Sequence, residues 1–425
     1  MTGGMAANEP RNLACLVAYQ VTSRIGWIFK TETVIMPAVL DACIDSGLLR
    51  GLLPVLNRAG HSLVPLLLAP AVARARSLRW LLMGTTAGLA GCFGLLAVAW
   101  ANWAVERPAV MAGVFLVLYT LFSAINGGNQ LIVAALQGRL IAAGHRGRLL
   151  LLSVTIGSVL AITVAIFALG PWLQQVDGFA SIFAATAAFF LLAAVVPVWF
   201  VEPAIPAGAV STQHVPTGSR DGWAVCRDPA LLRLAAVAAC FSAVLMLFPH
   251  YQAFARERFG TGSGSLLTWV IVQNVATGLA SLVVGPVADR RGNRIVLIGL
   301  VGLCVVTPLG VTGLALLNAH AAANWFWVVY LPLGLNPILL RIISNYALEL
   351  AEDIVHQPRY VSLVGLALAV PFLLSPLIGW GIDQVGAEPI FLAGAGVIAT
   401  GTVLACGLPE PRGRAADGRV SETGL

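Results

Sequence analysis

The feature that most constrains the fold of this chain is a series of long apolar runs. About 20 apolar residues are needed for a helix to cross the hydrocarbon core of a bilayer. Twelve runs near this length lie at residues 13–39, 50–72, 79–101, 108–136, 149–171, 178–201, 229–254, 265–287, 294–317, 323–347, 360–382 and 388–408. Because lipid offers no hydrogen bonds to a peptide backbone, each run is predicted to be a helix. The sequence therefore predicts an all-α membrane protein with twelve transmembrane helices.

The composition excludes most soluble classes of protein. Apolar residues make up 58% of the chain and charged residues 10%, whereas a soluble domain carries about 25% charged residues. Seven cysteines are scattered without metal-ligand spacing, so we expect no metal site and no disulfide framework. The sequence contains no nucleotide-binding loop of the G-x-x-x-x-G-K type and no nucleophile motif. We therefore expect no cofactor, no ATP-driven step and no enzymatic activity.

The arginines divide the predicted loops into two sets. One alternate set carries thirteen: Arg74, Arg76, Arg79, Arg139, Arg146, Arg148, Arg220, Arg227, Arg233, Arg290, Arg291, Arg294 and Arg359. The opposite set carries four: Arg50, Arg107, Arg256 and Arg258. By the positive-inside rule the first set is cytoplasmic, which also places both termini in the cytoplasm. We expect a multi-pass plasma-membrane protein (the inner membrane in a bacterium), and we interpret the arginines as topology signals rather than a nucleic-acid surface.

The polar segment 202–228 is predicted to be a cytoplasmic linker because it is rich in Pro, Gly, Ser and Thr. It separates an N-terminal bundle of six spans (1–201) from a C-terminal bundle of six (229–408), and a cytoplasmic tail follows (409–425). The loops APAVARARSLRWLLMG and GPVADRRGNRIVLIG echo one another across the two halves. Two pseudo-symmetric bundles joined by a linker are typical of secondary transporters.

The loop between the eighth and ninth spans resembles a family signature. The segment GPVADRRGNRIVL resembles the G-x-x-x-D-R-x-G-R loop of the major facilitator superfamily, with Gly285, Asp289, Arg290, Gly292 and Arg294 at the matching positions. The resemblance implies the two-bundle fold of that family and a charge relay that latches helices at the cytoplasmic face. The first-half copy lacks both the Asp and the glycine turn.

Elementary chemistry suits this signature. We expect Gly285 to let two helices approach closely and Gly292 to permit a tight turn. Asp289 is expected to cap a helix end and to pair with a neighbouring Arg.

Span 1 is the richest in polar groups at membrane depth. Gln20, Arg24, Trp27 and Thr31 follow one helical stripe, and we expect Arg24 to hold an anionic substrate group or else to form a structural ion pair. Trp27 and Lys30 are further candidates for the substrate site, although Lys30 could instead snorkel to the interface. Glu32 is a candidate proton-coupling carboxylate or an interfacial residue. In a continuous helix Lys30 and Glu32, two residues apart, cannot share a face.

Other polar groups in spans are also candidates for substrate contact. In the first half they are Arg58 and His61 of span 2 and Asn126 and Gln130 of span 4; in the second half they are His250, Gln273, Arg341 and Asn345. For each amide the alternative is a hydrogen bond that merely joins helices. The steps from Arg341 through Asn345 to Glu349 predict a cytoplasmic gate or structural network that includes Arg359 and Asp353, with direct substrate contact as the second possibility.

The leading functional hypothesis is a secondary transporter that works by alternating access. The first-half spans hold Arg24, Lys30 and Arg58 against a single acid, Glu32, and a positive cavity favours an anionic or zwitterionic organic solute. Proton-coupled symport through Glu32 is one mode of this hypothesis. The alternatives are an efflux pump for amphipathic compounds and a non-transporting receptor or scaffold with the same fold. We expect a monomer whose partners are a small-molecule substrate, protons and the lipid bilayer.

Overall fold

The computed structural model describes residues 2–142, 145–175, 178–202, 227–351 and 357–411, and all regular structure in these ranges is helical. Contacts divide the chain into two compact units, Met1–Gln213 with Gly262–Ile271, and His214–Thr261 with Val272–Leu425. Most of the predicted linker 202–228, the tail from 412 and Asp353 lie outside the described residues.

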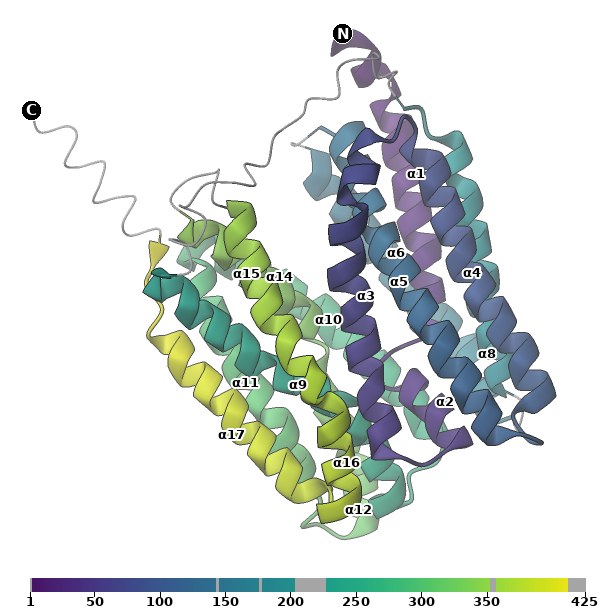
Figure 1. Ribbon diagram of the computed structural model, residues 1–425, viewed down its shortest axis with the longest axis vertical. Helices are drawn as coiled ribbons and strands as arrows, with labels where there is room; N and C mark the ends of the chain where they lie inside the picture. The colour runs from purple at the N-terminus through teal and green to yellow at the C-terminus, as the bar shows by residue number, and fades with distance from the viewer. Residues whose placement is uncertain (1, 143–144, 176–177, 203–226, 352–356, 412–425) are drawn as a thin grey trace, which may run out of the picture. The chain divides into compact units, whose positions relative to one another are not determined.

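The first half of the chain folds into the following helices (Figure 1): α1 (Thr2–Phe29), α2 (Ile35–Cys43), α3 (Gly47–Arg74), α4 (Leu78–Trp103), α5 (Pro108–Leu140), α6 (Arg146–Val164), the π-helical turn η2 (Ala165–Leu169), α7 (Gly170–Leu173), α8 (Gly178–Val195) and the 3-10 turn η3 (Val196–Trp199). The second half forms α9 (Pro229–Phe259), α10 (Gly264–Arg291), α11 (Asn293–Leu314), α12 (Ala319–Trp325), η6 (Phe326–Val329), α13 (Tyr330–Leu333), α14 (Asn336–Leu350), α15 (Gln357–Ala369), η7 (Val370–Leu374), α16 (Ser375–Val385) and α17 (Ala387–Cys406).

Among the described residues, eleven helical stretches are long and apolar enough to span a membrane. They correspond to predicted spans 2 to 12, and their ends agree with the predictions to within several residues, as for Leu78–Trp103 against 79–101. Span 2 forms despite the polar residues that interrupt it, because α3 runs unbroken from Gly47 to Arg74. The all-helical membrane fold is therefore confirmed.

The prediction of one continuous helix over 13–39 is wrong. The first helix ends at Phe29 and a second, α2, begins at Ile35. The physical reason is Pro37, in the first turn of α2, which has no N–H and whose ring would clash with the carbonyl of Thr33 in a continuous helix. The break falls within the predicted first span, which is not among the eleven stretches. Non-helical backbone within a span is tolerated where it is enclosed by protein or lines a cavity.

Within the first unit, α3 and α5 cross in backbone contact. A Cβ on Gly127 would lie 2.1 Å from the carbonyl oxygen of Gly60, and a Cβ on Gly60 would lie 2.3 Å from the carbonyl of Ser123. Only hydrogen fits at either position, so the two glycines are required for this approach. We call this contact the α3–α5 crossing; α3 and α5 lie side by side in Figure 1.

The second unit contains a corresponding crossing between its own second and fourth spans. A Cβ on Gly334, between α13 and α14, would lie 2.4 Å from the carbonyl oxygen of Gln273 on α10. The hydroxyl of Thr277 donates to the Gly334 carbonyl (2.6 Å) and also to the Gln273 carbonyl of its own helix (2.9 Å). We call this contact the α10–Gly334 crossing.

Candidate functional site

The non-helical segment 30–34 between α1 and α2 positions the candidate site in the first unit. Thr31 organises it: its hydroxyl donates to the carbonyl of Ile28 in the last turn of α1 (2.8 Å). Its own carbonyl accepts the backbone N–H groups of Ile35 (2.8 Å) and Met36 (3.2 Å) in the first turn of α2. Thr31 thus satisfies backbone groups of both helix ends and fixes the path of the chain between them.

Lys30, the first residue of this segment, is fully buried, with 1% of its surface exposed. Its ammonium forms an ion pair with Glu32. The same nitrogen lies 4.1 Å from the ring centroid of Trp27 and 4.4 Å from that of Phe122, with the Tyr119 ring at 5.8 Å. The negative faces of these rings attract the cation, but Glu32 supplies its neutralising charge.

Two expectations about this pair are wrong. Lys30 does not snorkel, because its ammonium is enclosed by rings from α1 and α5. Lys30 and Glu32 do meet, although they are only two residues apart. The helical argument against their contact fails because the helix ends at Phe29, so both residues lie in non-helical chain.

Polar contacts continue from Glu32 across α3 to α5. Asn57 donates its side-chain amide to Oε1 of Glu32 (2.6 Å). The backbone carbonyl of Asn57 bonds Nδ1 of His61 (2.9 Å), and Nε2 of His61 bonds Nδ2 of Asn126 on α5 (2.8 Å). The chain Lys30–Glu32–Asn57–His61–Asn126, which we call the polar chain, therefore joins the α1–α2 break to the α3–α5 crossing.

The partners of His61 link its protonation state to the Asn126 amide. A carbonyl can only accept, so Nδ1 carries the proton that it shares with Asn57. With the amide nitrogen of Asn126 toward Nε2, as in this structure, Nε2 accepts and this arrangement suits a neutral imidazole. The side-chain carbonyl of Asn126 is buried and has no hydrogen-bond partner among the described residues. A protonated His61 would need that carbonyl in place of the amide nitrogen, so its titration is coupled to the orientation of Asn126.

The other first-half candidates differ in their relation to the polar chain. Trp27 packs edge-on against Phe122, with the ring centroids 5.6 Å apart. Arg24 lies against α6, where its Cδ would be 2.9 Å from a Cβ on Gly157. Arg58, half-buried on α3, acts electrostatically on His61 together with Glu32 and Lys30. Gln130 is exposed on α5 and belongs to no contact of the polar chain.

The structure places the second-half candidates on several helices of their unit. His250 is buried in α9, and Gln273 is half-buried on α10 beside the α10–Gly334 crossing. Arg341 and Asn345 are exposed and lie one turn apart on the same face of α14. These two side chains are exposed, whereas His250 is enclosed by its unit.

The signature loop between α10 and α11 is partly as expected. Gly292 has φ +86°, a conformation that suits glycine, and Arg294 donates to the carbonyl of Cys406 at the end of α17 (2.9 Å). A Cβ on Gly285 would meet no described atom within 4 Å, so the expected close approach there stays a prediction. Arg290 is exposed, Glu349 and Arg359 are half-buried, and the side chain of Asp289 lies outside the description.

In the first unit, the carboxylate of Glu202 joins the end of the sixth span to the start of the third. Glu202, after η3, accepts the backbone N–H groups of Leu78 (2.9 Å) and Arg79 (2.7 Å) and so caps the start of α4. Arg79 donates to the carbonyl of Phe200 (2.9 Å), as Arg294 does to Cys406 in the second unit. The first-half copy of the signature loop, which lacks the Asp and the glycine turn, therefore still makes an Arg-to-carbonyl contact between the third and sixth spans.

Sequence reasoning missed three contributors to the candidate site. Asn57 was not among the predicted site residues, yet it links Glu32 to His61. The rings of Tyr119 and Phe122 around Lys30 gave no signal distinct from other apolar residues. The signal that could have revealed the broken helix was Pro37.

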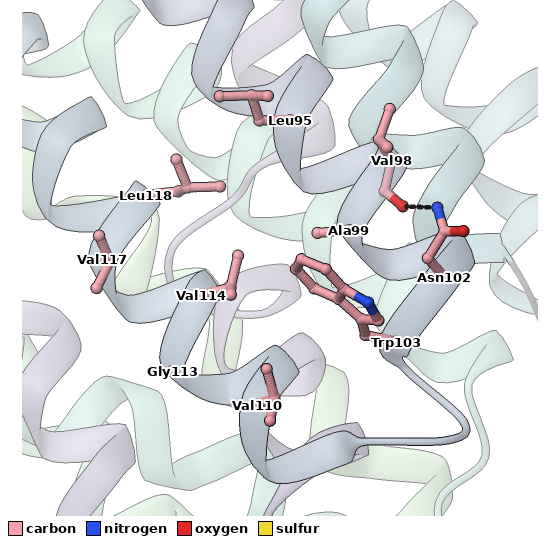
Figure 2. A pocket seen from close by; sticks show the side chains of 10 residues that line it. All are labelled: Leu95, Val98, Ala99, Asn102, Trp103, Val110, Gly113, Val114, Val117 and Leu118. Atoms are coloured by element: carbon pink, nitrogen blue, oxygen red, sulfur yellow. Dashed lines mark hydrogen bonds between the residues drawn. The ribbon is translucent and has the colours of Figure 1, made fainter.

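A surface groove between α4 and α5 does not have the chemistry of a polar-solute site. It holds about 710 Å³ between α4 and α5 and is lined by apolar side chains such as Leu95, Val98 and Val117, which Figure 2 shows on the facing sides of the two helices. Its one amide, Asn102, is turned back onto the Val98 carbonyl of its own helix (2.7 Å). Such a surface is suited to contact with lipid. Among the described residues no group of three or more His, Cys, Asp or Glu side chains could hold a metal ion.

Comparison with known proteins places these features in a family. A profile of the Major Facilitator Superfamily matches residues 51–349, while a search of curated proteins finds no match. Among solved structures, a mutant of the nucleoside transporter NupG matches with a TM-score of 0.69 at 13% identity, covering 93% of this chain and 99% of that one. An auto-inhibited POT family peptide transporter matches with a TM-score of 0.63 at 14% identity, covering 94% and 96% of the two chains.

A bacterial homologue of the human lysosomal transporter Spinster, in an inward-facing and occupied conformation, is also similar. Its TM-score is 0.63 at 13% identity, with 92% of this chain and 95% of that chain covered. At these identities the three structures indicate a shared fold and carry no information about the substrate of this chain. The family profile spans more than half of the chain, so the chain belongs to the major facilitator superfamily and is a membrane-embedded secondary transporter rather than an enzyme.

Proposed function

We propose that this transporter carries a small organic anion or zwitterion by alternating access and that the polar chain of the first unit contributes to the substrate site. The observation that carries the proposal is Lys30, a fully buried cation whose neutralising partner is the single carboxylate of Glu32. Ionisable side chains inside transmembrane segments are costly and usually mark a substrate or ion pathway. Lys30 lies at a broken helix, the place where transporters of other folds bind charged solutes.

The proposed site draws on further residues of the sequence prediction. In the first unit they are Arg24, Trp27, Lys30, Arg58, His61, Asn126 and Gln130, with Glu32 as the proton-coupling group. In the second unit the exposed face of α14 offers Arg341 and Asn345 as partners for a polar substrate, and His250 and Gln273 are retained as candidates. The excess of cations is the reason for preferring an anionic or zwitterionic solute.

The proposed architecture of transport follows the sequence. The bundles 1–201 and 229–408 rock about the substrate site, and the segment 202–228 links them. The arginine-rich loops and both termini face the cytoplasm, where Gly285, Asp289, Arg290, Gly292, Arg294, Glu349 and Arg359 take part in gating. We propose a monomer in the plasma membrane, or in the inner membrane of a bacterium, that works as a proton-coupled symporter.

The experiment is a thermal-shift screen of the detergent-purified protein against organic acids, amino acids, sugars, nucleosides and neutral amphipathic compounds. Hits are then tested for uptake into liposomes. We expect stabilisation by anions or zwitterions that is lost in Lys30→Gln and retained in Arg107→Gln, a control at an exposed cation outside the spans. Stabilisation by neutral amphipathic compounds alone would show the proposal to be wrong and would favour amphipathic efflux.

A further inference from the structure

We propose that a pocket at the arginine-rich end of the first unit binds the phosphate of an anionic phospholipid. The pocket holds about 320 Å³, and its polar lining consists of Arg11 on α1, Arg76, Ser77 and Arg79 around the start of α4, and Glu202 after η3. We call it the basic pocket. A lipid site of this kind concerns the contact of the transporter with the bilayer, so it goes beyond the proposed function and does not depend on the identity of the substrate.

Hydrogen bonds between separate segments of the chain fix the walls of the basic pocket. The side-chain amide of Asn12 on α1 donates to the Val201 carbonyl (3.0 Å), and its side-chain oxygen accepts the Val201 N–H (2.9 Å). Arg79 on α4 donates to the carbonyl of Phe200 (2.9 Å), and η3 packs against both α1 and α4. The basic pocket is therefore built from three segments that are bonded to one another.

The single carboxylate of the basic pocket is already engaged by neighbouring donors. Oε1 of Glu202 accepts the Ser77 hydroxyl (2.8 Å) and the Arg79 N–H (2.7 Å), and Oε2 accepts the Leu78 N–H (2.9 Å). With the described part of the chain Glu202 forms no ion pair. Three guanidinium groups against one carboxylate leave two positive charges in excess in the basic pocket.

The three arginines have donors to offer an anion. Arg11 and Arg76 are exposed and form no hydrogen bond or ion pair with a described residue. The buried Nε of Arg79 likewise has no hydrogen-bond partner among the residues that the structure describes. Guanidinium groups present paired N–H donors that match the oxygens of a phosphate. The chemistry of the basic pocket therefore suits a phosphate group.

The surroundings of the basic pocket favour a lipid over a soluble phosphate. Val198 lines the pocket and is 45% exposed, and Trp80, whose ring centroid lies 5.0 Å from the Arg79 guanidinium, is 48% exposed. These residues lie at the ends of two spanning stretches, Leu78–Trp103 and Gly178–Trp199, and tryptophan at the end of a span is typical of the headgroup level of a bilayer. A phospholipid can place its phosphate on the arginines and its acyl chains on the apolar surface beside them.

The proposed orientation agrees with an anionic lipid. The arginine-rich loops face the cytoplasm in that orientation, and the cytoplasmic leaflet carries the anionic lipids. Basic pockets between transmembrane helices on that side of a membrane bind lipid headgroups.

The test is native mass spectrometry of the detergent-purified full chain, titrated with phosphatidylglycerol and with phosphatidylcholine of the same acyl chains. We expect the unsubstituted protein to bind phosphatidylglycerol, which is anionic, more tightly than phosphatidylcholine, which is zwitterionic. Arg76→Gln should weaken phosphatidylglycerol binding about fivefold and Arg11→Gln combined with Arg76→Gln about 25-fold, the attraction expected from one and from two arginines near an anionic lipid. Neither side chain is bonded to a described residue, so these variants should fold.

Arg74→Gln is the matched control. Arg74 is exposed at the end of α3, close in sequence to Arg76, and does not line the basic pocket. The substitution removes the same charge and should leave the affinity for phosphatidylglycerol nearly unchanged. Equal weakening in Arg74→Gln and Arg76→Gln would assign the attraction to the charge of the whole loop and would overturn the proposal, as would equal affinity for the two lipids.

A competition measurement separates a lipid from a soluble phosphate. Glycerol 3-phosphate has the phosphate chemistry of the lipid without its acyl chains, so even in large excess it should not displace bound phosphatidylglycerol. Displacement would show that the basic pocket is a site for a soluble phosphate and that the assignment to a lipid is wrong.

Discussion

The α3–α5 crossing of the first unit and the α10–Gly334 crossing of the second solve the same packing problem with different chemistry. Both bring the second and fourth spans of a half into backbone contact at glycine. In the first unit the adjacent side-chain contact is the His61–Asn126 bond, which depends on the protonation of an imidazole. In the second it is the bond from Thr277 to the Gly334 carbonyl, which involves no titratable group. The comparison indicates that close packing is common to both halves, whereas the polar contact beside the first crossing uses a titratable side chain and the one beside the second does not.

Of the two crossings, the larger expected effect is at the one with the shorter contact. In Gly127→Ala the new Cβ would lie 2.1 Å from the carbonyl oxygen of Gly60, so α3 and α5 must separate. We expect a loss of about 3 kcal/mol in the free energy of unfolding, the upper range for overpacking. Thermal unfolding in detergent measures it, with Gly113→Ala on the same helix as the control, because nothing lies within 4 Å of a Cβ there. Equal losses in both variants would show that the α3–α5 crossing is not a close contact.

The second unit should show a smaller effect of the same kind. In Gly334→Ala the new Cβ would lie 2.4 Å from the Gln273 carbonyl oxygen and 2.9 Å from Cβ of Ala276. We expect a loss of about 2 kcal/mol, measured in the same way. Gly278→Ala on α10, with no atom within 4 Å of its Cβ, is the control and should be close to neutral. A loss larger than that of Gly127→Ala would reverse the order that the distances predict.

The fold was largely predictable because each span can be recognised from its own run of apolar residues. The apolar run at 79–101 needs no knowledge of its neighbours to be recognised as a helix, and α4 covers Leu78–Trp103. The positive φ of Gly292 was likewise predictable, because the turn chemistry resides in the residue itself. Where the physical cause is local, the sequence alone was sufficient.

The candidate site was less predictable because its contacts depend on helix register and on one break. The predicted stripe from Arg24 to Thr31 required a continuous helix. The helix instead ends at Phe29, because Pro37 prevents it from continuing. Whether Asn57 would meet Glu32, and His61 would meet Asn126, depends on how α3 is rotated and shifted against its neighbours. Those relations are set by packing at Gly60 and Gly127, which a list of polar residues does not contain.

The hydrogen bond beside the first crossing should contribute less than the glycines. Asn126→Ala removes the partner of Nε2 of His61, and we expect a loss of about 1 kcal/mol, within the range for hydrogen bonds between membrane helices. Gln130→Ala, exposed on the same helix, is the control and should have little effect. A neutral result for both variants would mean that the glycine contact alone holds α3 to α5.

The hydroxyl beside the second crossing should contribute less again. Thr277→Val keeps the shape of the side chain and removes the bond to the Gly334 carbonyl, with an expected loss of about 0.6 kcal/mol. Thr312→Val is the matched control, because that hydroxyl bonds the Pro308 carbonyl of its own helix. The loss in Thr277→Val should be the same at pH 6 and pH 8. A pH-dependent loss would break the distinction between the two crossings.

The smallest expected effect tests proton sensitivity in the first unit outside the spans. Glu9 on α1 accepts the backbone N–H of Ala142 (2.9 Å) and pairs with His145 (3.0 Å), and these bonds lower the pKa of its carboxyl. A lowered pKa in the folded state means that the ionised form is favoured by folding, so its contribution is complete above the usual carboxyl pKa and is lost as the pH falls through the folded value. Glu9→Gln should therefore be slightly less stable than the unsubstituted protein at pH 7, and the difference should shrink as the pH falls below the usual carboxyl pKa, by thermal unfolding in detergent. Glu106→Gln, at an exposed acid between α4 and α5, should show no such convergence, and the same convergence in both variants would assign the effect to overall charge instead of to the contact between Glu9 and the end of α5.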